Sequence, residues 1–243
     1  MTKYVPLQVR AHLAAGIAQA SPWGIALDGI LAAELWAAQK ATWLANDLTW
    51  TRARDHDNPP DLDLPLARCE LADGLWHWAA TSALPEGDPS RTDIHTWTGR
   101  TDARDLEQVA VGLPQVVSER QGRWRARRMP LLVSPCRSVT WQAVGDPIAI
   151  RGLVEGVGSI GKKRTSGEGQ VLSWEVTVVP GLDPVHAAHL HADGTLGRPT
   201  PTACLTHLPT PLQTGGTGRA GLRPPYIHPS RQMDLHLPAL LDR

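Results

Sequence analysis

The sequence lacks the features that mark several special classes of protein. It has no phenylalanine, only three cysteines, and no apolar run long enough to span a membrane. Cys69, Cys136 and Cys204 are odd in number and far apart, which excludes a disulfide framework or a CxxC zinc site and favours a reducing cytoplasm. Residues 1–10 show no signal-peptide pattern. We therefore expect a cytoplasmic protein without membrane contact, cofactor or metal.

The chain as a whole has no net charge, but its two halves carry net charges of opposite sign. Residues 1–119 hold 9 Lys and Arg against 16 Asp and Glu, whereas residues 120–243 hold 15 against 8. Such asymmetry is typical of a protein with a polyanion-binding face, although an uneven solvated surface produces it as well. Apolar residues make up 42% of 243, enough to bury a sizeable core.

The spacing of apolar residues predicts strands and helices in alternation. We expect strands at residues 3–13, 138–144 and 170–179, and a hairpin at 67–83 around Asp73 and Gly74. One helix is predicted over residues 27–44, with Asp28 as N-cap and Trp36 and Trp43 in the core, and another from Asp146 to about 156. This order predicts an α+β fold, a ferredoxin-like βαββαβ antiparallel sheet with helices on one face.

The remaining segments are predicted to be insertions and an extension. Residues 1–180 form the domain, with inserted loops at 46–66 and 84–105 and a basic hairpin at 118–133. Residues 180–243 contain 10 Pro and 7 Gly in 64 positions. We therefore expect residues 181–243 to be a Pro/Gly-rich extension of long loops packed on the domain, with short strands such as residues 232–237.

The most informative segment is a glycine-rich basic loop at residues 156–169. Gly156, Gly158 and Gly161 match a dinucleotide fingerprint, but here a helix precedes and a strand follows, which is the reverse of that motif. A phosphate-binding P-loop is excluded because Lys163 replaces the hydroxyl residue that binds magnesium. Glycines allow close backbone approach, and the adjacent cations suit nucleic-acid phosphates. The predicted contacts in this loop are Gly161, Lys162, Lys163, Arg164, Gly167 and Gly169.

Two further segments combine cations with aromatic residues. In the basic hairpin they are Arg120, Arg123, Trp124, Arg125, Arg127 and Arg128. Near the C-terminus they are Arg219, Arg223, Tyr226, His228 and Arg231. Arginine pairs with phosphate bidentately and stacks on bases, so both segments are predicted to contact RNA. The alternatives are a solvated arginine run for the first segment and a Pro-rich cover over the core for the second.

The motifs RARRMPL, GKKRTSGEG and GLRPPYIHPSRQ, with LDGILA upstream, resemble the Cas-five-type subunit of type IV CRISPR effector complexes, within the RAMP superfamily. The most specific parts of the resemblance are residues 120–179 and 218–232. Glu168 stands where the family commonly has an aromatic residue. The resemblance implies a non-enzymatic RNA-binding subunit that holds the 5′ handle of the CRISPR RNA and caps a filament of Cas-seven-type backbone subunits. It also implies a large or small effector subunit as partner and indirect contact with target DNA, in antiviral or anti-plasmid defence.

Two alternatives remain open at this stage. A metal-independent endoribonuclease of the same superfamily would need a base, for which His77, His95 and His228 are candidates tied to no motif. A protein scaffold without direct RNA contact would use the arginine runs against acidic protein surfaces. A metal site at His186, His189 and His191 is disfavoured because no Cys or acidic residue lies at a characteristic spacing and Pro184 interrupts a helix.

Overall fold

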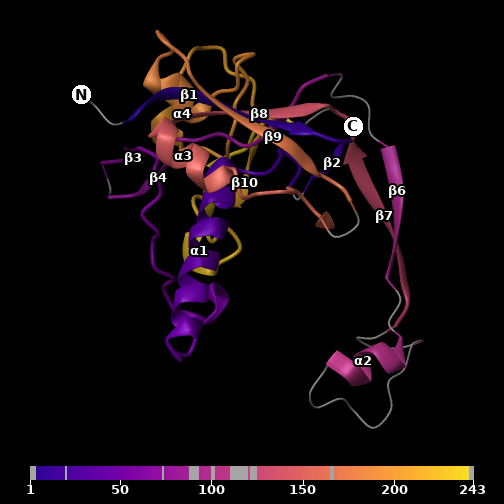
Figure 1. Ribbon diagram of the computed structural model, residues 1–243. Helices are drawn as coiled ribbons and strands as arrows, with labels where there is room; N and C mark the ends of the chain where they lie inside the picture. The colour runs from indigo at the N-terminus through magenta and orange to yellow at the C-terminus, as the bar shows by residue number, and fades with distance from the viewer. Residues whose placement is uncertain are drawn as a thin grey trace.

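The central element of the fold is a four-stranded antiparallel sheet. The computed structural model describes residues 4–19, 21–72, 74–87, 93–99, 102–109, 120, 125–164 and 167–240. The strand order is β5-β8-β1-β9, and each adjacent pair is antiparallel (Figure 1). Their bounds are β1 Val5–Leu13, β5 Leu84–Pro85, β8 Ser138–Gly145 and β9 Val171–Val178. The protein is thus of mixed α+β class, and the three long strands lie where the sequence predicts them.

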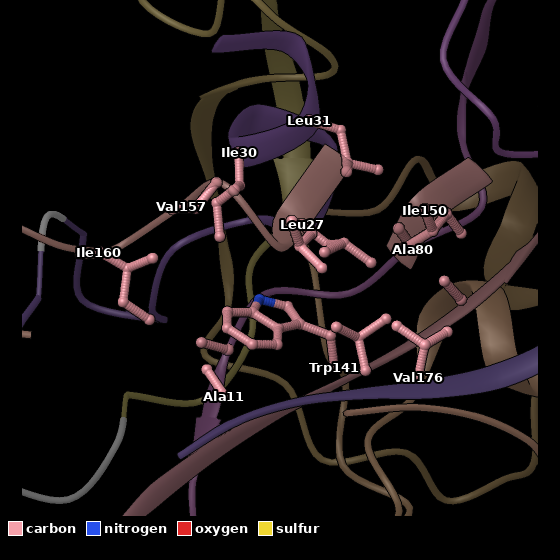
Figure 2. Close-up of a cluster of buried hydrophobic side chains, with 14 of the residues drawn as sticks. Ala11, Leu27, Ile30, Leu31, Ala80, Trp141, Ile150, Val157, Ile160 and Val176 are labelled. Carbon is pink, nitrogen blue, oxygen red and sulfur yellow. The ribbon is translucent and has the colours of Figure 1, made fainter. Parts of the chain in front are cut away.

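Two helices cover one face of this sheet. They are α1 (Leu27–Ala45) and α3 (Pro147–Val154), which contact each other. The α3 helix begins as predicted, because the Asp146 side chain accepts hydrogen bonds from the backbone N–H groups of Ile148 and Ala149. In Figure 2 the fully buried Trp141 of β8 lies among Leu27, Ile150 and other apolar side chains. Its indole N–H donates to a backbone carbonyl at 2.8 Å, so the large ring is buried without an unsatisfied donor.

A second antiparallel sheet has the order β2-β7-β6 and includes a long two-stranded ribbon that extends from the body (Figure 1). The bounds are β2 Ile17–Ala18, β6 Asp93–Gly99 and β7 Arg127–Ser134. Helix α2 (Ala103–Val109) lies between β6 and β7 in the sequence. The predicted inserted loop at residues 84–105 includes the strand β6, and the basic strand β7 pairs with β6. The predicted hairpin at 118–133 lies partly outside the described residues. The Ile, Thr and Trp content of β6 favours a strand.

The beginning of the C-terminal segment covers the opposite face of the central sheet, whereas Tyr226 of the same segment contacts Asp28 of α1. Its helix α4 (Pro184–His189) contacts β8 and β1, and Ala187 and Ala188 pack against Val144. All eight residues of β8 are consequently buried, as expected for a strand covered on both faces. The other elements of this segment are α5 Thr202–Leu205, β10 Thr217–Gly221, the 3₁₀ turn η4 Pro229–Arg231 and β11 Gln232–His236. The predicted short strand near residue 232 is confirmed.

The predicted hairpin at residues 67–83 is confirmed as strands β3 (Arg68–Glu70) and β4 (Trp76–Trp78). A 3₁₀ turn, η1 (Ala53–Asp55), lies in the preceding connection. None of the helices in the described part of the chain is both long and apolar enough to cross a membrane.

Three details differ from the predictions. Ala26 caps α1, whereas Asp28 lies fully buried in the first turn, where it accepts a hydrogen bond from the Tyr226 hydroxyl. Trp43 is 45% exposed and packs edge-on against Trp50, because the second half of α1 extends beyond the sheet (Figure 1). Pro184 does not interrupt a helix but begins α4, since its missing N–H is not needed at that position.

Candidate nucleic-acid interface and a buried cysteine–histidine cluster

Two glycines of the glycine-rich loop are required by close contacts within the protein. Gly161 has φ +88°, and a Cβ there would lie 2.5 Å from the carbonyl oxygen of Ala18. Gly169 has φ +66°, and its Cβ would lie 1.9 Å from the carbonyl oxygen of Ile160. The Lys162 N–H donates to Ala18 at 2.8 Å and the Gly169 N–H donates to Gly16 at 3.1 Å. These two N–H groups serve the fold, not an anion.

The three consecutive cations of the loop have different environments. Lys162 and Arg164 are exposed, whereas Lys163 is half-buried with its Nζ 3.3 Å from the centroid of the Trp97 ring on β6. A second tether joins Glu168 to His95 of β6 at 2.6 Å, and this hydrogen bond raises the pKa of His95. Both contacts fix the loop against the ribbon, while Lys162 and Arg164 are exposed to solvent.

The ribbon itself presents two arginines. Arg127 and Arg128 of β7 are exposed and lie opposite Gly99 and Thr98 of β6. Because adjacent residues in a strand point to opposite faces, they serve different sides of the ribbon. Arg120 and Arg125 are also exposed, whereas Arg123 and Trp124 lie outside the described residues.

The loop and ribbon together form a cationic surface. In residues 93–99, 125–134 and 159–170, six Lys and Arg face only two carboxylates, Asp93 and Glu168. Glu168 is engaged with His95, which reduces its effect on the neighbouring cations. A surface of this composition attracts a polyanion, and the attraction depends strongly on salt.

The C-terminal basic segment is placed differently. Arg223 and Arg231 both form ion pairs with Asp61, and Arg231 is only 6% exposed. Tyr226 bonds to Asp28, and the His228 ring contacts Ser230 and a backbone oxygen. Of the five predicted contacts only Arg219, on β10, is exposed. The other four cover the core, as the alternative of a Pro-rich cover predicts, and are not available to contact RNA.

A cluster of four side chains gathers where the C-terminal segment meets the β3–β4 hairpin. Cys69 and His77 are directly opposite in the hairpin, His189 is the last residue of α4, and Cys204 lies in α5. Their four potential ligand atoms lie within 4.8 Å of one another. Burial lowers the pKa of His77 to about 4, and the hydrogen bond with Cys204 lowers the pKa of Cys69.

The cluster could not be predicted from a sequence motif, because the spacing of its residues is unusual. Seven residues separate Cys69 from His77 and fourteen separate His189 from Cys204, whereas zinc ligands commonly lie two to five residues apart within each pair. One signal was present, since a hairpin centred on residue 73 pairs Cys69 with His77. The approach of the other two residues depends on tertiary packing.

Comparison with known proteins does not assign the chain to a family. No protein-family model matches the sequence, and no curated protein matches it significantly.

Proposed function

We propose that this protein is a non-enzymatic RNA-binding subunit whose glycine-rich loop and β6–β7 ribbon bind the phosphates of a single-stranded RNA. The observation that carries the proposal is the exposure of Lys162 and Arg164 beside a ribbon with two further exposed arginines. The Lys163–Trp97 contact orients the loop, so the exposed cations are held before the ligand arrives. Such preorganisation lowers the entropic cost of binding.

A ferredoxin-like topology of the central sheet and its helices is part of the same proposal. With β1, α1, β5, β8, α3 and β9 as its core elements, the chain would follow the βαββαβ order of a ferredoxin-like domain. The strand order β5-β8-β1-β9 and its antiparallel pairing support this interpretation. The β3–β4 hairpin and the β6–β7 ribbon would then be additions, and residues 181–243 an extension.

By resemblance, the RNA would be the 5′ handle of a CRISPR RNA in a type IV effector complex. The protein would cap a filament of Cas-seven-type subunits and contact a large or small effector subunit, and target DNA would be met only indirectly. The acidic first half of the chain would face protein partners or solvent. These roles depend on the glycine-rich loop and the flanking motifs of the sequence.

A salt titration of RNA binding tests the proposal. Each phosphate contact contributes a slope of about 0.7 to the logarithmic dependence of affinity on salt for a single strand. We expect the double variant Lys162→Ala/Arg164→Ala to lower the slope by about 1.4. The control double variant Lys40→Ala/Arg52→Ala removes two exposed cations on and beyond α1 and should leave the slope unchanged.

Equal slopes for both double variants would refute the role of the loop. Purification free of nucleic acid, with no measurable affinity for RNA, would favour the protein scaffold instead. Fluorescence anisotropy with a labelled single-stranded RNA gives the affinity at each salt concentration.

A second candidate function, metal-independent RNA cleavage, is favoured by one observation. His95 lies beside the cationic loop with its side chain 48% exposed and bonded to Glu168, an arrangement that suits a general acid. His77 and His228 are buried and therefore unsuited to reach RNA. Incubation of RNA with the protein and a chelator distinguishes the functions. A discrete product that disappears in His95→Ala would establish the enzyme.

A further inference from the structure

Four of the six distances within the cluster match those of a tetrahedral metal site, and all six are within 4.8 Å. The Cys69 and Cys204 Sγ atoms are 3.8 Å apart, and the Nε2 atoms of His77 and His189 are 3.3 Å apart. The Cys69 Sγ atom lies 3.8 Å from His189 Nε2, and the Cys204 Sγ atom lies 3.5 Å from His77 Nε2. Zinc bonds of about 2.3 Å to sulfur and about 2.05 Å to nitrogen require, at tetrahedral angles, separations of about 3.8 Å, 3.3 Å and 3.6 Å respectively.

The histidine rings are held with their metal-binding nitrogens toward the centre. His77 donates its Nδ1–H to the Trp78 carbonyl at 2.9 Å, and His189 donates its Nδ1–H to the Val185 carbonyl at 2.8 Å. A carbonyl only accepts, so each neutral ring has a bare lone pair on Nε2. Two lone pairs 3.3 Å apart repel unless a cation lies between them, and such backbone hydrogen bonds are typical of metal-ligating histidines.

We propose that Cys69, His77, His189 and Cys204 bind one structural zinc ion. On binding, both thiols release their protons to solvent, and the two thiolates balance the two positive charges of zinc. The site is then neutral, which suits its burial. Four protein ligands fill a tetrahedral shell and leave no position for substrate, so the role is structural. This inference is independent of RNA binding.

The proposed ion would connect three parts of the chain that are far apart in the sequence. The β3–β4 hairpin provides two ligands, and α4 and α5 of the C-terminal segment provide one each. A hollow of about 230 Å³, lined by Cys69, His189, Cys204 and their neighbours, adjoins the cluster and gives zinc or a chelator a route to it. We therefore expect the metal to be tightly bound but removable.

The test measures metal in the full chain, purified without chelators from cells grown with zinc. Elemental analysis should give one zinc per chain, and the cobalt-substituted protein should show the intense visible bands of tetrahedral cobalt with a near-ultraviolet thiolate-to-metal band. Cys204→Ser should lower the zinc content at least tenfold. Cys136→Ser removes a half-buried cysteine outside the cluster and should retain one zinc per chain.

A second variant covers the case in which Cys204→Ser fails to fold. His77→Cys changes a Cys₂His₂ site to Cys₃His, which also binds zinc, and the third thiolate should raise the charge-transfer intensity of the cobalt protein by about half. Wild-type protein without zinc, a Cys69–Cys204 disulfide in place of metal, or an octahedral cobalt spectrum would overturn the proposal.

Discussion

Two arginine-rich parts of the molecule use the same side chain in opposite ways. In the C-terminal segment, Arg198 is 2% exposed, and its guanidinium donates to the backbone carbonyls of Trp78, Ala80 and Leu222. On the loop and ribbon, Arg164, Arg127 and Arg128 are exposed. Burial and available acceptors therefore decide whether an arginine stabilises the fold or remains available to a ligand.

Removal of one arginine from each part tests whether the buried and the exposed arginines differ in this way. Arg198→Leu leaves three buried carbonyls with fewer donors and the buried Asp28 carboxylate without its nearby cation. We expect the free energy of unfolding to fall by about 3–5 kcal/mol and the melting temperature by about 6–20 °C. Calorimetry or thermal unfolding followed by circular dichroism measures the change.

Arg164→Leu is the matched variant in the exposed part. It should change the free energy of unfolding by no more than about 0.5 kcal/mol, yet lower the salt slope of RNA binding by about 0.7. Similar losses of stability in the two variants would remove the distinction between the regions.

A smaller effect separates two glycines within the loop. Gly169→Ala places a Cβ against the Ile160 carbonyl oxygen, whereas Gly167 has φ +90° but no atom within 4 Å of its Cβ position. We expect Gly169→Ala to lower the free energy of unfolding by about 2–3 kcal/mol and Gly167→Ala by about 1 kcal/mol, from backbone strain alone. Urea titrations compare them, and an equal loss would contradict the packed position of Gly169.

The smallest effect concerns the tether between loop and ribbon. Glu168 raises the pKa of His95 above 6.5, so their contact is fully formed below pH 6.5 and is lost as the pH rises through the raised pKa. An NMR titration should show the His95 pKa returning toward 6.5 in Glu168→Gln. The control Glu155→Gln, on an exposed carboxylate after α3, should leave it raised. An unchanged pKa in Glu168→Gln would contradict the tether.

Much of the fold could be predicted from local patterns. The β1, β8 and β9 strands and the Asp146–Pro147 helix start follow from alternation and capping, which depend on neighbours in sequence. The pairing of β6 with β7 could not, because the two strands are separated by a helix and a long connection. The exposed half of α1 was misjudged for a similar reason, since helical spacing does not show where the sheet ends.

The two candidate sites also differ in how far they could be predicted from the sequence. The cations at residues 162–164 are adjacent in sequence, so the basic loop could be predicted directly. The Cys–His cluster combines a hairpin, the end of α4 and α5, and only packing brings them together. Tyr226 and Arg231 show the converse, because their apparent RNA-binding chemistry is used by Asp28 and Asp61 inside the protein.

The cluster can be completed only late in the synthesis of the chain. His77 and Cys204 are 127 positions apart, so a ribosome that adds about 5–20 residues per second makes Cys204 about 6–25 seconds after His77. During that interval the nascent hairpin presents one thiol and one imidazole without their counterparts. The cluster is consequently completed late in translation, after all strands of the central sheet have been synthesised.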